Sequence, residues 1–192
     1  AAVFANPPAA GTAAGEFEAT YGQTYVERDS GPLKADIYLP EGEGPFPLVL
    51  IVHGNHDMKD YSDPGYGYLG ELFASRGYIF ASVDENFLNG GIGGENDARG
   101  WMLLQHLKAW KTFNDSVGSP FHGRVDMSRI ALMGHSRGGE AVAIAAAFNR
   151  LSRYPDNAAL TFDFNFDIKA IAAIAPVDGQ YRPSSKPTPL DN

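Results

Sequence analysis

The segment from Gly134 to Gly139 carries the clearest chemical signal in the sequence. It reads Gly134-His135-Ser136-Arg137-Gly138-Gly139 and lies between the apolar residues 130–133 and the alanine-rich residues 141–147. A serine with glycines two positions before and after it can occupy a tight strand-to-helix turn, where its hydroxyl stands clear of the backbone. The free N–H groups at the start of the helix would then face an oxyanion formed there. The pattern predicts Ser136 as the nucleophile of an acyl-transfer reaction; the alternative is a glycine-rich helix start with an incidental serine.

A second group, His53-Gly54-Asn55-His56, follows the apolar run at residues 48–52. An acyl-transfer enzyme needs a backbone donor opposite its nucleophile, and a loop that follows a buried strand upstream of the serine can supply one. The backbone N–H of Asn55 is the predicted donor. The alternative is a polar turn that only ends a buried strand.

Five side chains in this region could also be interpreted as a metal site: His53, His56, Asp57, Asp60 and Asp63. A His-x-x-His pair on a loop lacks the fixed i, i+4 face of a zinc-binding helix, and the aspartates miss the spacing of a calcium loop. We therefore interpret them as a solvated acidic loop and expect neither metal nor cofactor. The absence of cysteine excludes disulfides, thiolate zinc sites and a cysteine nucleophile.

Three other features are expected to be structural. The glycines at 90–94 lack the Lys-Ser/Thr pair of a phosphate loop and predict a mobile loop that borders the cleft. His106 falls inside a predicted helix, and His122 falls in a loop with proline and glycine. Neither histidine is predicted to take part in catalysis.

Strands and helices alternate along most of the chain. Residues 25–27 and 33–39 alternate in polarity around a turn at 29–32 and predict an antiparallel hairpin. Apolar runs and helical spacing then predict strands at 48–52, 78–83, 129–133 and 168–175, with helices at 68–76, 95–113 and 140–151. This order favours an α/β fold: a mostly parallel sheet with helices on both faces. Its binding site lies beyond the carboxyl ends of the strands.

Length and composition limit the remaining possibilities. The chain has 192 residues, 44% of them hydrophobic and 20% charged, which suits one globular domain. We expect an irregular N-terminal arm at residues 1–20 and a single domain at 21–192. The net charge of −8 argues against nucleic acid as a partner, and no apolar run reaches the ~20 residues of a membrane span. The start of the chain favours a secreted or periplasmic location for a processed protein.

These residues resemble the α/β-hydrolase superfamily, and within it the dienelactone-hydrolase-like, cutinase-like and chlorophyllase-like esterases. The resemblance extends from about residue 25 to residue 178 and rests on these segments: Lys34-Ala35-Asp36-Ile37-Tyr38-Leu39-Pro40, Ile51-Val52-His53-Gly54, Leu72-Phe73-Ala74-Ser75-Arg76-Gly77-Tyr78, Val125-Asp126, Arg129-Ile130, Met133 through Gly139, and Ala175-Pro176. It implies a three-layer sandwich, with Ser136 as nucleophile and the backbone amides of Asn55 and Arg137 as the oxyanion hole. It also implies a small-molecule or lipid-like ester as substrate.

The sequence departs from the polyester-degrading cutinases at three positions. Those enzymes usually carry an aromatic residue, a methionine and a tryptophan where this chain has Asn55, Arg137 and Val177. Those three side chains clamp an aromatic substrate. The resemblance therefore implies that this clamp is absent here.

A second departure concerns the catalytic triad. In this superfamily the acid and the histidine follow the serine, yet all five histidines here precede Ser136. We expect a sheet truncated after about its sixth strand, with the C-terminal part of the domain missing, and a C-terminal remainder of the same protein that supplies the base. Asp178, at the end of the last predicted strand, could hold the acid position that some lipases use.

Two functions remain open. The first is a serine hydrolase that cleaves carboxylic esters through an acyl-enzyme on Ser136. The second is a non-catalytic binding protein that has kept the α/β-hydrolase fold without a complete triad.

Overall fold

The computed structural model describes residues 3–5, 33–89 and 94–183. Its elements, in chain order, are β1 (Val3–Ala5), β2 (Ala35–Leu39), β3 (Phe46–Val52), η1 (Asp63–Tyr66), α3 (Gly67–Ala74), β4 (Ile79–Val83), η2 (Asn86–Leu88), α4 (Asn96–Asp115), β5 (Val125–His135), α5 (Arg137–Phe148), β6 (Arg153–Tyr154), β7 (Asn157–Thr161) and β8 (Ile168–Ile174). No helix within these ranges is long and apolar enough to cross a bilayer.

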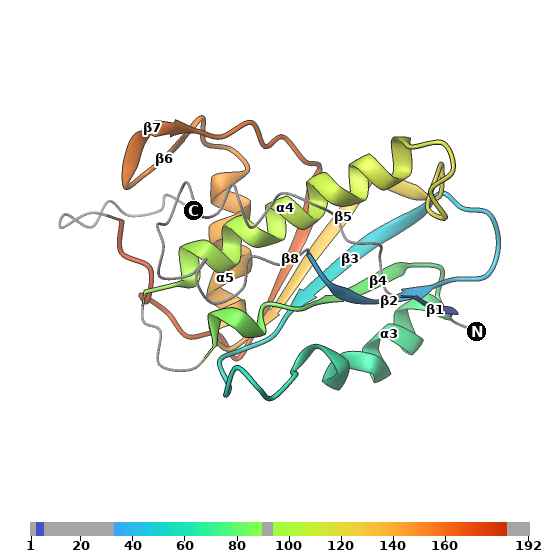
Figure 1. Cartoon of the computed structure of the whole chain (residues 1–192), viewed down its shortest axis with the longest axis horizontal. Helices are drawn as coiled ribbons and strands as arrows, with labels where there is room; N and C mark the ends of the chain where they lie inside the picture. The colour runs from blue at the N-terminus through green and yellow to red at the C-terminus, as the bar shows by residue number, and fades with distance from the viewer. Residues whose placement is uncertain (1–2, 6–32, 90–93, 184–192) are drawn as a thin grey trace.

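The main sheet has six strands in the order β1-β2-β4-β3-β5-β8 (Figure 1). β4, β3, β5 and β8 are mutually parallel, whereas β2 runs antiparallel to both of its neighbours. The carboxyl ends of β3 and β5 are in register, with Val52 opposite Gly134. The predicted α/β fold with a mostly parallel sheet is confirmed, and the register brings the two predicted loops of the site to one edge.

Helices cover both faces of the sheet and complete three layers (Figure 1). On β3, Leu48, Leu50 and Val52 face the larger core, to which α4 and α5 contribute their apolar side chains. The alternate residues, Val49 and Ile51, pack on the other face with Phe80 against α3. Burial on both faces explains the continuous apolar run of this strand.

The N-terminal part differs from the predicted arrangement. Residues 25–27, predicted as the first strand of a hairpin, lie outside the described residues. β2 instead pairs antiparallel with β1, which falls within the arm predicted to be irregular, and with β4. A three-residue strand is too short to produce a readable alternation in the sequence.

A small antiparallel hairpin, β6–β7, was not predicted from the sequence. It follows α5, and an aromatic cluster lies beside it: the ring centroids of Phe148 and Phe162 are 5.1 Å apart, and those of Tyr154 and Phe162 are 6.0 Å apart. The residues of β7 are mostly exposed, so the strand has no apolar face to produce alternation. The flanking aromatic residues pack together instead, and this packing leaves no alternating pattern in the sequence.

Candidate active site

Ser136 occupies a strained turn between β5 and α5. Its φ of 56° and ψ of −119° lie in a region that non-glycine residues rarely adopt, and such strain often marks functional sites. Its N–H donates to Ile174 O at 3.0 Å, and its carbonyl accepts from Gly139 N at 2.9 Å and from Val177 N at 3.1 Å. α5 begins at Arg137, three residues before the predicted start, so the free N–H groups of its first turn lie directly after the serine.

Two glycines allow the turn to close against the sheet. A Cβ on Gly134 would lie 1.9 Å from Gly138 O, and a Cβ on Gly138 would lie 2.5 Å from Val52 O. No side chain fits at either position, because the obstructing atoms belong to the backbone. Gly138 is therefore required by close approach to the end of β3, and Gly134 by close approach to the first turn of α5.

The loop after β3 lies directly against the serine. A Cβ on Gly54 would be 2.8 Å from Ser136 Cβ and 3.4 Å from Ser136 Oγ. The structure thus brings together the two segments that the sequence predicted to act together. The role of Asn55 N–H as an oxyanion donor stays a prediction.

His53 is buried and fixes the loop from within. Its Nδ1–H donates to Gly54 O at 2.8 Å, and its Nε2 accepts from Glu85 N at 3.1 Å. Burial, with a further contribution from the nearby Arg99 charge, lowers the pKa of His53 to about 4, so the ring is neutral at pH 7. This neutral ring holds the Gly54 carbonyl, and hence the plane of the Gly54–Asn55 peptide.

The interpretation of this region as a solvated acidic loop is correct for Asp57 and Asp60 and wrong for His53 and Asp63. Asp63 is buried, and Asn86 Nδ2 donates to its Oδ1 at 2.7 Å. Burial raises the pKa of Asp63. Asp63 starts η1, whereas Asp57 and Asp60 are exposed. Among the described residues, no three His, Cys, Asp or Glu side chains are placed to hold a metal ion.

A buried charge network that was not predicted from the sequence lies behind the serine turn. Glu85, Glu95 and Arg99 are fully buried, and Arg137 joins them. Burial raises the pKa of Glu85 to about 8, against the opposing effect of Arg99. One signal was available: Arg99 lies four residues before Leu103 and so continues the apolar stripe of α4.

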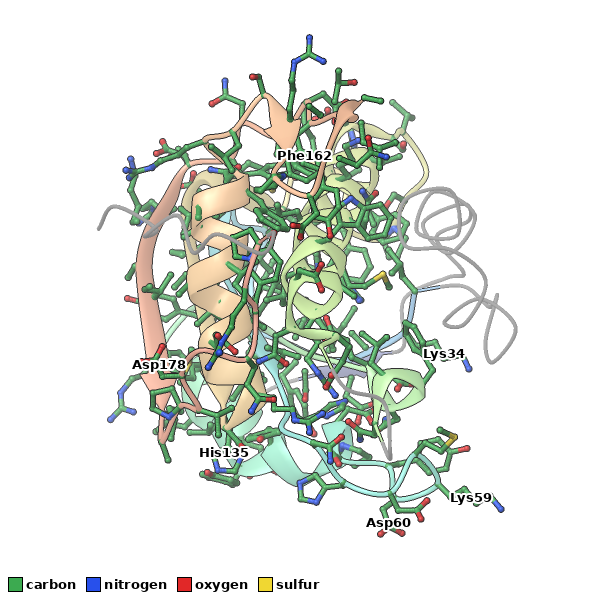
Figure 2. The ribbon with its side chains drawn as sticks, turned by 90° about the vertical axis from the view of Figure 1, so that its left-hand side faces the viewer. Lys34, Lys59, Asp60, His135, Phe162 and Asp178 are labelled. Carbon is green, nitrogen blue, oxygen red and sulfur yellow. The ribbon has the colours of Figure 1, made fainter. Side chains whose placement is uncertain are left out.

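None of the other histidines, all of which lie in the described ranges, hydrogen-bonds to the serine hydroxyl. His106 is buried in α4, where burial lowers its pKa to about 3, and His122 Nδ1 hydrogen-bonds to Asn114 O on an exposed surface. Figure 2 shows His135 at the same end of the molecule as Asp60, opposite to Phe162. Among the described residues, no side chain hydrogen-bonds to Ser136 Oγ, and the position of a general base stays a prediction.

The segment after β8 is fixed beside the turn by one carboxylate. Glu140 Oε1 accepts from Gln180 N at 2.9 Å and from Tyr181 N at 3.2 Å, and Glu140 Oε2 accepts from Asn96 Nδ2. Asp178 lies in this segment with an exposed side chain (Figure 2). Among the described residues, no hydrogen bond or ion pair involves the Asp178 side chain, and its role as the acid stays a prediction.

Two similarities to known proteins agree with this geometry. Residues 13–190 match the family described as chlorophyllase. A bis(hydroxyethyl) terephthalate hydrolase of Streptomyces coelicolor is 33% identical over 112 residues, which cover 57% of this chain and 32% of that protein. The matched region thus spans about a third of that relative's length. Because the family match extends over residues 13–190, this chain belongs to the chlorophyllase family.

Proposed function

We propose that this chain carries the nucleophile of a serine hydrolase, which cleaves carboxylic esters through an acyl-enzyme on Ser136. The observation that carries the proposal is the strained Ser136 backbone at the start of α5, with the Gly54–Asn55 loop packed against its side chain. A structural serine would not need a positive φ at this junction. A nucleophile does, because the turn lifts its hydroxyl out of the sheet edge.

The reaction proceeds in two steps. Ser136 Oγ attacks the ester carbonyl while a general base takes its proton, and the N–H groups of Asn55 and Arg137 stabilise the oxyanion. The C–O bond to the alcohol then breaks, and the alcohol leaves with that proton. Water attacks the acyl-enzyme by the same route, releases the acid and restores the serine.

We propose that the base is a histidine from residues that follow position 192 in the full-length protein. β8 is an edge strand in the described sheet, and Ile171 and Ile174 on it are 46% and 39% exposed. Beside it lies an open hollow of about 780 Å³, lined in part by Ala146, Phe166 and Ile168. An apolar edge and an adjoining hollow suit a further strand and helix of the same protein.

A comparison of chain lengths tests this source of the base. Residues 1–192 alone should retain only the weak acceleration that the oxyanion hole supplies without a triad, whereas the full-length protein should turn over esters efficiently. Equal turnover by the two forms would place the base among the five histidines of this chain.

The substrate class that we propose is a small ester. The relative's name refers to bis(hydroxyethyl) terephthalate, so this diester is the aromatic substrate to test beside an aliphatic one such as p-nitrophenyl butyrate. Because Asn55, Arg137 and Val177 replace the residues of the aromatic clamp, the proposed preference is for the aliphatic ester.

The experiment that tests the proposed function is a serine substitution in the full-length protein. Ser136→Ala should abolish hydrolysis of p-nitrophenyl acetate, while Ser75→Ala, at an exposed serine that caps α3, should leave the rate unchanged. Turnover that persists unchanged in Ser136→Ala would assign the reaction to another nucleophile, and lack of turnover in the wild type itself would favour a non-catalytic binding protein.

A further inference from the structure

A buried carboxylate connects the serine turn with the helix behind it. Glu95, which directly precedes α4, is fully buried, and its Oε1 accepts from Arg137 Nη1 and from Arg99 Nε at 3.5 Å. Arg99 is held in turn, since its Nη2 donates to Asn89 Oδ1 at 2.8 Å and to Leu88 O at 3.1 Å. Glu95 is therefore a fixed anchor for the Arg137 side chain.

The Arg137 side chain extends from this anchor to the loop after β3. Its Nη1 donates to Asn55 Oδ1 at 3.3 Å as well as to Glu95. Arg137 directly follows the proposed nucleophile, and Asn55 is the second residue of the loop that packs on Ser136. One guanidinium therefore joins the two residues whose backbone N–H groups are the proposed oxyanion donors.

This connection holds the donor peptide from a second side. His53 Nδ1 already fixes the oxygen of the Gly54–Asn55 peptide, and Arg137 fixes the side chain of the residue that carries the N–H. An oxyanion hole is effective when its donors are positioned before the reaction, and small displacements reduce its effect. Buried ion networks contribute little net stability, so a positioning role accounts for this one better than stabilisation does.

We propose that Glu95 and the Arg137 side chain form a positioning strut, which we define as the Glu95–Arg137–Asn55 contacts, that sets the distance between the two oxyanion donors. The inference rests on the proposed function of Ser136. It also relates two departures from the cutinases: Asn55 and Arg137 occur together because each side chain is the other's partner.

A double-mutant cycle in the full-length protein tests the strut. Arg137→Met removes the guanidinium and keeps the backbone N–H of residue 137. Asn55→Ala removes the side-chain amide that accepts from Arg137 and keeps the backbone N–H of residue 55. Each variant should lower kcat for p-nitrophenyl acetate about tenfold with KM within about twofold. The displaced donors would weaken stabilisation of the charge that develops in the transition state, and binding of the neutral ester would change little. The double variant should be no slower than the slower of the two single variants, because both substitutions break the same contact.

Two controls separate positioning from general damage. Arg76→Met, at an exposed arginine after α3, should leave kcat unchanged, and thermal melting should show that all variants are folded at the assay temperature. Glu95→Gln offers an independent check at the anchor. If it folds, it should lower kcat without changing KM, and it should abolish the coupling between residues 55 and 137.

The outcomes distinguish the strut from the proposed function. Multiplicative losses in the double variant, or wild-type kcat in either single variant, would overturn the strut while Ser136-dependent turnover persists. Turnover that does not depend on Ser136 would overturn both.

Discussion

Substitution of Gly54 by alanine should separate the oxyanion loop from the nucleophile. The added Cβ would lie 2.8 Å from Ser136 Cβ and 3.3 Å from His135 O, whereas ordinary contacts begin at 3.4 Å. The loop and the serine turn must therefore move apart by about 0.6 Å, the difference between 2.8 and 3.4 Å. The obstructing atoms are close to the backbone, so no side-chain rotation relieves the contact.

The expected effect follows from that displacement. A misplacement of about 1 Å in an active site can cost about 10²-fold in rate, so Gly54→Ala should lower kcat by about 10- to 100-fold. The overpacking should also reduce the free energy of unfolding by about 1–3 kcal/mol. Both effects can be measured in the full-length protein, by p-nitrophenyl acetate hydrolysis and by urea unfolding followed by circular dichroism.

Gly65→Ala is the matched control for this change. Gly65 lies in η1, its φ is not in the left-handed region, and a Cβ there would have no heavy atom within 4 Å. This variant should keep wild-type kcat and equal or slightly higher stability. Wild-type kcat in a folded Gly54→Ala protein would refute the placement of the oxyanion loop against Ser136.

Three further predictions concern the donor and two buried titratable groups. Asn55→Pro, which removes the N–H, should lower kcat by about 10² to 10³ beyond the loss in Asn55→Ala; equal rates in the two folded variants would place the donor elsewhere. Burial raises the pKa of Asp97 from 3.8 to about 6, so its contribution to stability is full below about pH 4 and is lost as pH rises through 6. Relative to wild type, the free energy of unfolding of Asp97→Asn should therefore rise by up to about 3 kcal/mol between pH 4 and 7 in urea unfolding, provided Tyr154 keeps its hydrogen bond. A difference in free energy of unfolding that stays constant with pH would contradict this. Burial lowers the pKa of His106 from 6.5 to about 3, so the free energy of unfolding of the wild type should fall by up to about 5 kcal/mol as pH falls through that range. The free energy of unfolding of His106→Leu should fall correspondingly less. Parallel acid-unfolding curves for the two proteins would contradict this.

The sequence predicted the parts of the fold that rest on local patterns. The apolar run of β3 is visible because both faces of this strand are buried, and the glycines around Ser136 are visible because backbone atoms approach them closely. The strained φ of Ser136 was implied by the same glycine spacing. These features depend on residues that are near one another in the chain.

The remaining features depend on contacts between distant segments. Arg99 lies on the buried side of α4 and Glu95 directly precedes the helix, and Arg137, about 40 residues later, completes their charge network. The part that His53 plays in its loop also depends on a distant segment, because its ring lies between Gly54 O and Glu85 N. No spacing rule reports such pairings, because each partner is supplied by a different strand or loop.

Active-site labelling tests most directly whether Ser136 is the nucleophile. The full-length protein would be treated with a fluorophosphonate probe, digested, and analysed by mass spectrometry to locate the adduct. One adduct is expected, on Ser136, that appears as esterase activity disappears and is absent from Ser136→Ala. Loss of activity with the adduct on another residue, or unchanged labelling of Ser136→Ala, would contradict it.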